Sequence, residues 1–312
     1  MASSPLRKVV LVTALMVGGI TLALFRPDRP VDELKEKYAG GASRFIEIDG
    51  MPMHYRVEGR GFPLVLVHGT AASLHTWDGW VKELENDFTL VRFDLPAFGL
   101  TGPNRDHDYS IARYTLTMKK LLDALGVKKC HMAGNSLGGH IAWRFSLRYP
   151  GMVEKLVLID AAGYHHGGSM PWVFRLARAP VLNLAARRLT PEFLFRKNLR
   201  EVYGDDGKIT DELVRRYYDM ALRAGNRDAF IARAKASGNE TFEDPRRIAV
   251  PVLIQWGEAD AWIPVAQAGR FHSDIKNSKL KIYPGAGHVP MEEIPAVTAG
   301  DAKIFLKGGG RP

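Results

Sequence analysis

A serine between two glycines, in the pentapeptide Gly134-Asn135-Ser136-Leu137-Gly138, is the residue of this chain best placed to act as a nucleophile. It follows a strand-like run at residues 128–133 and precedes a helical pattern at residues 139–149. A G-x-S-x-G sequence between a strand and a helix is typical of a nucleophile elbow, a sharp turn that exposes the serine hydroxyl. The N-terminus of the following helix favours developing negative charge. The pattern therefore predicts that Ser136 is the nucleophile of an acyl-transfer reaction.

A serine hydroxyl needs a base near neutral pH, and the usual base is a histidine that a carboxylate holds in the correct tautomer. His288 lies in a loop of small residues, directly after the last predicted strand. Asp260 follows the strand before it. Two other acids compete for the role of Asp260: Asp160 ends the sixth predicted strand, and Glu258 lies at the same strand exit as Asp260. We expect Ser136, His288 and Asp260 to form a catalytic triad.

The elements that must position these residues alternate between strand and helix patterns, which is typical of a mostly parallel sheet covered by helices on both faces. The segment from 164 to 245 interrupts this alternation with helical patterns alone, and it indicates an inserted helical cap. The strands are predicted at residues 45–48, 54–57, 64–67, 90–93, 130–133, 156–159, 250–256 and 280–283. The predicted divisions are an N-terminal anchor and linker (1–43), the first part of a core domain (44–163), the helical cap (164–245) and the second part of the core (246–312).

Four further motifs, together with the elbow, resemble those of the α/β-hydrolase fold, in its lipase, esterase and meta-cleavage-product hydrolase branch. The resemblance covers about residues 45–306, and its order of nucleophile, acid and histidine is the one seen here. Ala97 stands where the family usually has glycine. The matching segments are His68-Gly69-Thr70, Phe93-Asp94-Leu95-Pro96-Ala97-Phe98-Gly99, Trp256-Gly257-Glu258-Ala259-Asp260 and Gly287-His288-Val289-Pro290-Met291-Glu292.

The resemblance implies an eight-stranded, mostly parallel α/β-hydrolase sheet with a helical cap. It also implies an oxyanion hole made by the backbone N–H groups of Thr70 and Leu137, and a reaction that uses no cofactor. His68, which precedes the oxyanion residue, is expected to be a structural hydrogen-bonding residue. Trp172, Phe174 and Leu176 are expected either to line an acyl pocket or simply to pack the cap helices.

The residue type expected to be the nucleophile limits which reactions of this fold are possible. Dehalogenases and epoxide hydrolases of this fold carry aspartate at the elbow, where this chain has Ser136. We favour a carboxylic ester hydrolase acting on a lipophilic small-molecule ester or lipid. The alternatives are hydrolysis of a carbon–carbon bond in an aromatic ring-cleavage product, a perhydrolase-like activity, and a non-catalytic binding protein on the same fold.

The N-terminal segment Val9–Phe25 contains no charged residue, and as a helix it is about 26 Å long, which is short for a bilayer span. We predict an uncleaved signal-anchor that places the catalytic domain outside the cytoplasm. A cleaved signal peptide, giving a secreted protein, is the alternative, although Thr21-Leu22-Ala23 matches a cleavage site poorly. Residues 26–43 are predicted to be a linker.

Charge and cysteine content exclude other classes. The net charge is +9, but no basic run is interleaved with aromatic residues, so we predict no nucleic-acid partner. The basic residues of the cap are scattered among acids, which indicates a solvated surface more than an attraction to anionic lipid. The single cysteine, Cys130, excludes an internal disulfide. Histidines and acids show no metal-ligand spacing, so no metal is predicted. The oligomeric state is not predicted.

Overall fold

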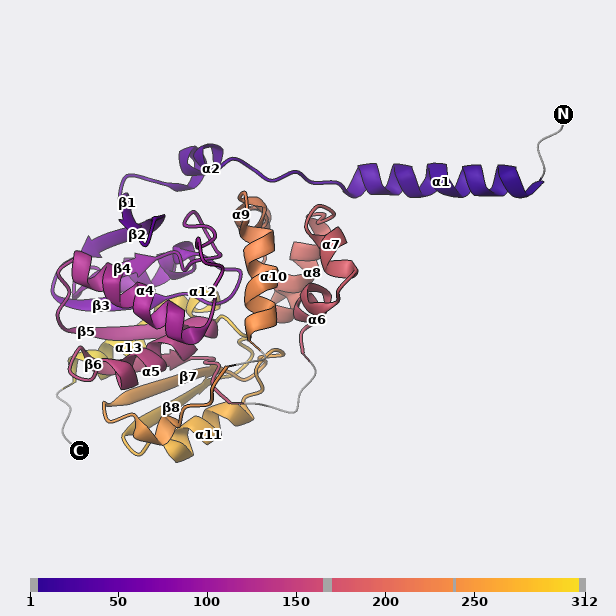
Figure 1. The fold of residues 1–312 in the computed structure, drawn as a ribbon. Helices are drawn as coiled ribbons and strands as arrows, with labels where there is room; N and C mark the ends of the chain where they lie inside the picture. The colour runs from indigo at the N-terminus through magenta and orange to yellow at the C-terminus, as the bar shows by residue number, and fades with distance from the viewer. Residues whose placement is uncertain (1–4, 165–169, 238–239, 309–312) are drawn as a thin grey trace.

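The computed structural model describes residues 5–164, 170–237 and 240–308 of the chain. Its centre is an eight-stranded sheet in the order β1-β2-β4-β3-β5-β6-β7-β8 (Figure 1). The β1–β2 and β2–β4 pairs are antiparallel and the other pairs are parallel, which confirms the predicted α/β-hydrolase sheet. The strands are β1 (Ser43–Ile48), β2 (Met51–Gly59), β3 (Phe62–Val67), β4 (Phe88–Phe93), β5 (Cys130–Asn135), β6 (Val153–Ile159), β7 (Val252–Gly257) and β8 (Ser278–Tyr283).

Helices cover both faces of the sheet because its central strands are apolar on both sides. In β3, Val65 and Val67 enter one core cluster, whereas Leu64 and Leu66 enter the other. This alternation is what the two-residue period of a strand buried on both faces requires. The first face is covered by α4 (Ile111–Ala124), α5 (Leu137–Arg148) and α11 (Ala266–Asp274), and the second by α3 (Asp78–Leu84) and α13 (Pro295–Lys307).

The described residues between β6 and β7 form helices, in the segment predicted to be a cap. Figure 1 shows these helices gathered beside the sheet and not layered on it. They are α6 (Trp172–Arg178), α7 (Leu182–Ala186), α8 (Phe193–Val202), α9 (Asp211–Leu222) and α10 (Asn226–Ala236). Shorter elements complete the chain: the 3₁₀ turns η1 (Leu74–Trp77), η2 (Asp206–Lys208) and η3 (Pro245–Arg247), and the helix α12 (Pro290–Glu293).

The first helix, α1 (Pro5–Leu24), extends away from the body of the molecule (Figure 1). Within the part of the chain that the structure describes, no helix has the length and apolar character that crossing a membrane requires. The predicted signal-anchor at Val9–Phe25 is therefore not supported by the structure.

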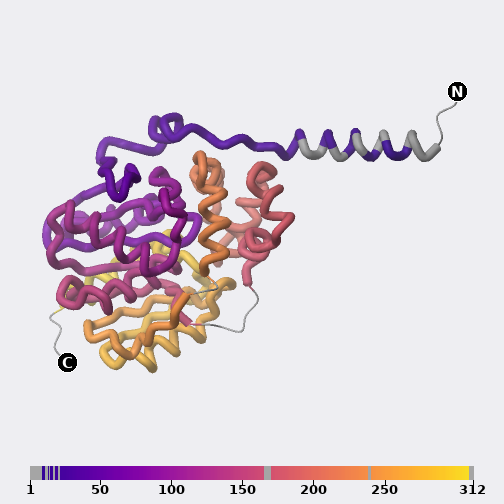
Figure 2. The backbone as a smooth tube through the Cα atoms, in the orientation of Figure 1, coloured from indigo at the N-terminus to yellow at the C-terminus, as the bar shows by residue number. Residues whose placement is uncertain are grey.

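Residues 25–38, which we call the N-terminal strap, are bound to the cap although the sequence predicts a linker here. The Arg26 N–H donates to the Arg188 carbonyl at 2.7 Å, and the Arg29 N–H donates to that of Leu222 at 2.7 Å. The strap ends in the helix α2 (Val31–Tyr38), where Leu34 is fully buried against Met220 of α9. Figure 2 traces this backbone from α1 past the cap to β1. The strap thus forms part of the outer support of the cap.

Asp219 of α9 binds three polar side chains of the strap. Its side chain is 2 % exposed and accepts hydrogen bonds from Arg29 (2.8 Å), Lys37 (2.7 Å) and the Tyr38 hydroxyl (2.7 Å). The change Asp219→Asn removes the charge that these three donors share. Because hydrogen bonds to charged groups contribute about 1.5–3 kcal/mol each, and Arg29 and Lys37 can rehydrate, we expect the free energy of unfolding to fall by about 1–3 kcal/mol.

Chemical denaturation measures this loss, and limited proteolysis shows whether cleavage within the strap accelerates. Asp32→Asn is the matched control, because Asp32 lies on α2 with a side chain 85 % exposed and pairs with Lys35 on the same helix. Equal stability and equal proteolysis of the Asp219 and Asp32 variants would contradict a role for Asp219 in holding the strap.

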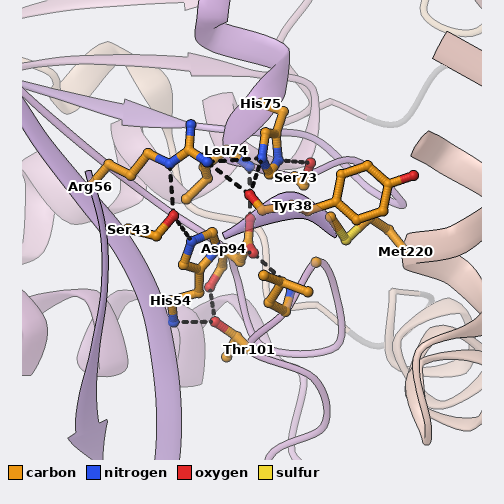
Figure 3. A network of polar contacts seen from close by, with 12 residues as sticks. Tyr38, Ser43, His54, Arg56, Ser73, Leu74, His75, Asp94, Thr101 and Met220 are labelled. Atoms are coloured by element: carbon orange, nitrogen blue, oxygen red, sulfur yellow. Dashed lines mark hydrogen bonds and ion pairs between the residues drawn. The ribbon is translucent and has the colours of Figure 1, made fainter. Parts of the chain in front are cut away.

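A second buried carboxylate, Asp94, fixes the loop after β4 (Figure 3). It accepts hydrogen bonds from the backbone N–H groups of Leu74 and Leu100, each at 2.7 Å, and pairs with the Nδ1 atom of His54 at 2.8 Å. Although burial raises the pKa of Asp94, the charge and hydrogen bond of His54 hold it well below its usual range. Asp94 therefore fixes two segments: the turn that begins at Leu74 and its own loop, through Leu100.

Candidate active site

The sharp turn predicted at Ser136 is formed between β5 and α5. Ser136 has φ 54° and ψ −117°, a left-handed conformation that is strained for a residue other than glycine. Its N–H donates to the Ile159 carbonyl at 3.0 Å, and its carbonyl accepts from the N–H groups of His140 and Ala162, each at 3.0 Å. These hydrogen bonds to β6, to α5 and to the residues after β6 hold the turn in place, and they offset the cost of its strained backbone.

The two glycines of the elbow are required by close backbone contacts. A Cβ atom at Gly134 would lie 2.3 Å from the Gly138 carbonyl oxygen. A Cβ atom at Gly138 would lie 2.1 Å from the carbonyl oxygen of Val67 in β3. Both distances are far below van der Waals contact, and the obstacle is backbone in each case, so no larger residue fits. The sharp turn at Ser136 therefore requires glycine at both positions.

His288 and Asp260 meet in a direct hydrogen bond. The distance from His288 Nδ1 to Asp260 Oδ2 is 2.7 Å, and the two side chains are 4 % and 0 % exposed. The other oxygen of Asp260 accepts the backbone N–H groups of Trp262 at 2.7 Å and Ile263 at 2.9 Å. The Trp262 ring lies 5.4 Å from that of His288, centroid to centroid. With Nδ1–H held by Asp260, Nε2 is the ring nitrogen that can act as a base.

The residue before the nucleophile links His288 to the elbow. The Asn135 side-chain N–H donates to the backbone carbonyl of His288 at 2.9 Å and to that of Ile159 at 3.2 Å. Ser136 itself is 9 % exposed. The three residues predicted from sequence thus follow strands in one half of the sheet: Ser136 comes after β5, Asp260 after β7 and His288 after β8, with β6 between β5 and β7. The roles of Asn135 and Trp262 were not predicted, since nothing in the sequence shows which residues these side chains reach.

The predicted oxyanion residues flank the elbow. Leu137 is the first residue of α5, where backbone N–H groups lack partners within the helix. A Cβ atom at Gly69 would lie 3.2 Å from that of Ser136, so the loop that carries Thr70 passes against the nucleophile. His68 holds this loop: its Nε2 accepts from the Leu95 N–H at 2.9 Å, and its Nδ1–H donates to the Gly69 carbonyl at 2.7 Å. Burial lowers the pKa of His68, as suits the neutral structural residue that was predicted.

The competing acids have other surroundings. Glu258 is exposed at the end of β7. Asp160 is fully buried and lies close by, with one carboxylate oxygen, one of Asp260 and one ring nitrogen of His288 all within 4.8 Å of one another. This trio has the composition of a metal site, but three of its four carboxylate oxygens already accept hydrogen bonds, from His288 Nδ1–H and from three backbone N–H groups. We therefore assign the trio to hydrogen bonding.

An apolar cavity of about 980 Å³, including its solvent-open part, lies between the core and the helices of the predicted cap. Thr70, from the predicted oxyanion loop, and Trp262, beside His288, belong to its wall. Of the aromatic and aliphatic residues considered from sequence, Trp172 and Leu176 line this cavity, whereas Phe174 packs between Phe230 and Trp262. Further apolar lining comes from Ala71, Phe98, Val173, Leu189, Leu194, Phe195, Met220, Phe230 and Ile231.

Known proteins share the fold of this chain. A family model described as the alpha/beta hydrolase fold matches residues 63–295. A 2-hydroxy-6-oxononadienedioate/2-hydroxy-6-oxononatrienedioate hydrolase of Pseudomonas putida is 30% identical over 261 residues, which cover 79% of this chain and 90% of the relative. Among solved structures, a membrane phospholipase A is 25% identical with a TM-score of 0.73 and covers 97% of both chains. A serine hydrolase involved in carbazole degradation is 26% identical with a TM-score of 0.73, covering 85% of this chain and 98% of its own. The chain therefore belongs to the α/β-hydrolase fold family.

Proposed function

We propose that this protein is a serine hydrolase that cleaves carboxylic esters with lipophilic acyl groups. The observation that carries the proposal is the buried His288–Asp260 hydrogen bond, tied through Asn135 to the strained elbow of Ser136. Nucleophile, base and orienting acid are the three parts that acyl transfer by serine requires.

In the proposed reaction, Ser136 Oγ attacks the ester carbonyl carbon while His288 Nε2 takes its proton. Asp260 keeps the imidazole in the required tautomer and stabilises the imidazolium that forms. The backbone N–H groups of Leu137 and Thr70 stabilise the negative charge on the carbonyl oxygen. His288 then protonates the departing alcohol, and it next removes a proton from the water that releases the acid from Ser136.

The proposed substrate class rests on the composition of the cavity. Its wall is dominated by aliphatic and aromatic side chains, with a few polar groups such as Thr190, Asn198 and Arg227. An apolar acyl chain leaves water favourably for such a wall, at about 0.8 kcal/mol per buried CH₂ group. The similarity to a solved structure described as a membrane phospholipase A also supports a lipophilic ester.

Filling the cavity should change the preferred chain length. Leu176→Trp places a larger side chain in the wall, and we expect kcat/KM for p-nitrophenyl esters of C8 and longer to fall by roughly tenfold or more, with little change for C2 and C4 esters. The measurement is kcat/KM across a C2–C16 series. The control is Ile304→Trp, an exposed position on α13 outside the cavity. An unchanged profile in the Leu176 variant would contradict binding of the acyl chain in this cavity.

The second candidate is hydrolysis of a carbon–carbon bond in an aromatic ring-cleavage product. The observation that favours it is the similarity to the Pseudomonas putida dienedioate hydrolase and to the serine hydrolase of carbazole degradation. Both reactions fit the same triad, so substrate assays decide between them. Turnover of a 2-hydroxy-6-oxo-dienoate, with no hydrolysis of any ester, would replace our leading proposal by this one. Absence of both activities in folded protein would leave the non-catalytic alternative.

A further inference from the structure

Asp160 is a buried acid that the proposed mechanism does not use. It follows β6 at φ 44°, and it is fully buried. Its Oδ1 accepts the Gly257 N–H at 2.9 Å. Among the described residues, its Oδ2 has no hydrogen-bond donor. An ionised carboxylate with an unsatisfied oxygen in such a site is costly, because burial deprives the charged form of its favourable hydration.

The groups that face Asp160 are acidic or neutral. They are Asp260 after β7, Glu293 of α12 and Tyr283 of β8, with the His288 ring beyond Asp260. Burial raises the pKa of Asp160 well above its usual range, and the negative charge of Asp260 raises this pKa further. A carboxylate oxygen of Asp160 lies within 4.8 Å of one of Asp260, and two carboxyl groups this close ionise in turn, so one of them retains its proton to a higher pH.

Asp260 is the member of the pair that receives more hydrogen-bond donors. It accepts two backbone N–H groups and the His288 Nδ1–H, whereas Asp160 accepts a single backbone N–H. Hydrogen bonds that donate to a carboxylate favour its charged form. The proton therefore belongs on Asp160, where it converts the orphan oxygen into a donor.

We propose that Asp160 is a positioning residue of the triad, a neutral carboxylic acid whose O–H donates to the Asp260 carboxylate. This inference rests on the proposed function for its catalytic consequence. The added bond fixes the plane of Asp260 against the His288 ring and shares part of its negative charge. Asp160 contacts no reacting atom, so its influence on the rate passes through Asp260.

Two substitutions that tolerate a left-handed backbone test the inference. Asp160→Asn supplies an N–H donor in nearly the same place, while Asp160→Gly removes the donor without backbone strain. We expect kcat/KM for an ester of the Asn variant to stay within about threefold of the wild type. For the Gly variant we expect a loss of roughly ten- to a hundredfold, as fits one hydrogen bond to a charged group. Equal losses in both variants would overturn the proposal.

The pKa of His288, followed by NMR, separates this role from a merely structural one. A neutral Asp160 exchanged for a neutral Asn leaves the charge beside His288 unchanged, so we expect its pKa to stay the same. If Asp160 were ionised, the Asn variant would remove a negative charge within 4.8 Å of His288. The pKa would then fall by about one unit or more, and the proposal would fail.

Unfolding measured against pH gives a third result that needs no turnover. Folded Asp160 keeps a proton that the unfolded chain releases above a pH of about 4. The folded state then binds more protons, so stability falls as pH rises up to the folded pKa. The unfolding constant of the wild type should rise relative to that of Asp160→Asn by up to about tenfold per pH unit over this range. A pH-independent ratio would overturn the assignment. If the wild type hydrolyses no ester while the NMR and unfolding results hold, the proposed function fails and the Asp160 assignment stands.

Discussion

Ser136→Ala is expected to lower kcat for ester hydrolysis by about 10⁶-fold, the loss seen when the nucleophile of a serine hydrolase is removed. The reason is that no other side chain at the elbow can form the acyl-enzyme. KM should change little, because the cavity wall is untouched. The measurement is steady-state kinetics on the p-nitrophenyl ester that the wild type hydrolyses best.

Ser146→Ala is the matched control for this change. Ser146 lies on α5, ten residues beyond the nucleophile, and donates its hydroxyl to the Trp143 carbonyl at 2.8 Å. We expect this variant to keep its activity. An organophosphonate ester should also label the wild type at Ser136, as located by peptide mass spectrometry, and should leave the Ser136 variant unlabelled. Retained hydrolysis in Ser136→Ala, or labelling at another residue, would refute the proposed nucleophile.

Asp260→Asn should lower kcat by about 10⁴-fold with the fold intact, as replacing the triad acid by its amide does. The side-chain amide presents an N–H where the carboxylate accepts the His288 Nδ1–H at 2.7 Å. The imidazole then prefers the tautomer with its proton on Nε2, which cannot take the proton of Ser136. Kinetics and circular dichroism of the same preparation separate this loss from unfolding.

The rival acids are the natural controls for Asp260. Glu258→Gln alters an exposed residue two positions away, and Asp160→Asn alters the buried neighbour. We expect both variants to remain active. A collapse of activity in Asp160→Asn with a mild effect in Asp260→Asn would show that the acid after β6 orients His288, and it would overturn the assignment made here.

The elements of the sheet were predictable because their signals are local. The apolar run 64–67 is buried on both faces as β3, and the strands predicted at 45–48 and 54–57 are found in β1 and β2, which form an antiparallel pair. The turn at Ser136 was predictable because the two glycines that it needs, Gly134 and Gly138, can be read directly from the sequence.

The N-terminal region was less predictable because its contacts are distant along the chain. Proline and mixed charge at residues 26–43 indicate a linker, yet Arg29 and Tyr38 bind Asp219, about 180–190 residues away. No local pattern reports such a partner. Likewise, an apolar run such as Val9–Phe25 predicts a membrane span by composition, and the described helices do not support one.

The sequence by itself determined the α/β-hydrolase fold, the elbow of Ser136 and the order of the candidate acids and base, because strand periodicity and tight glycine turns are encoded over a few residues. The tertiary structure decided which acid meets His288, since Asp160 and Asp260 both leave neighbouring parallel strands and differ only in the hydrogen bonds that reach them. It also decided where the cavity lies and which residues line it, since Thr70 of the predicted oxyanion loop shares the wall with helices more than 100 residues away along the chain. Contacts of this kind depend on how the strands and helices pack against one another, and spacing along the chain does not specify that packing.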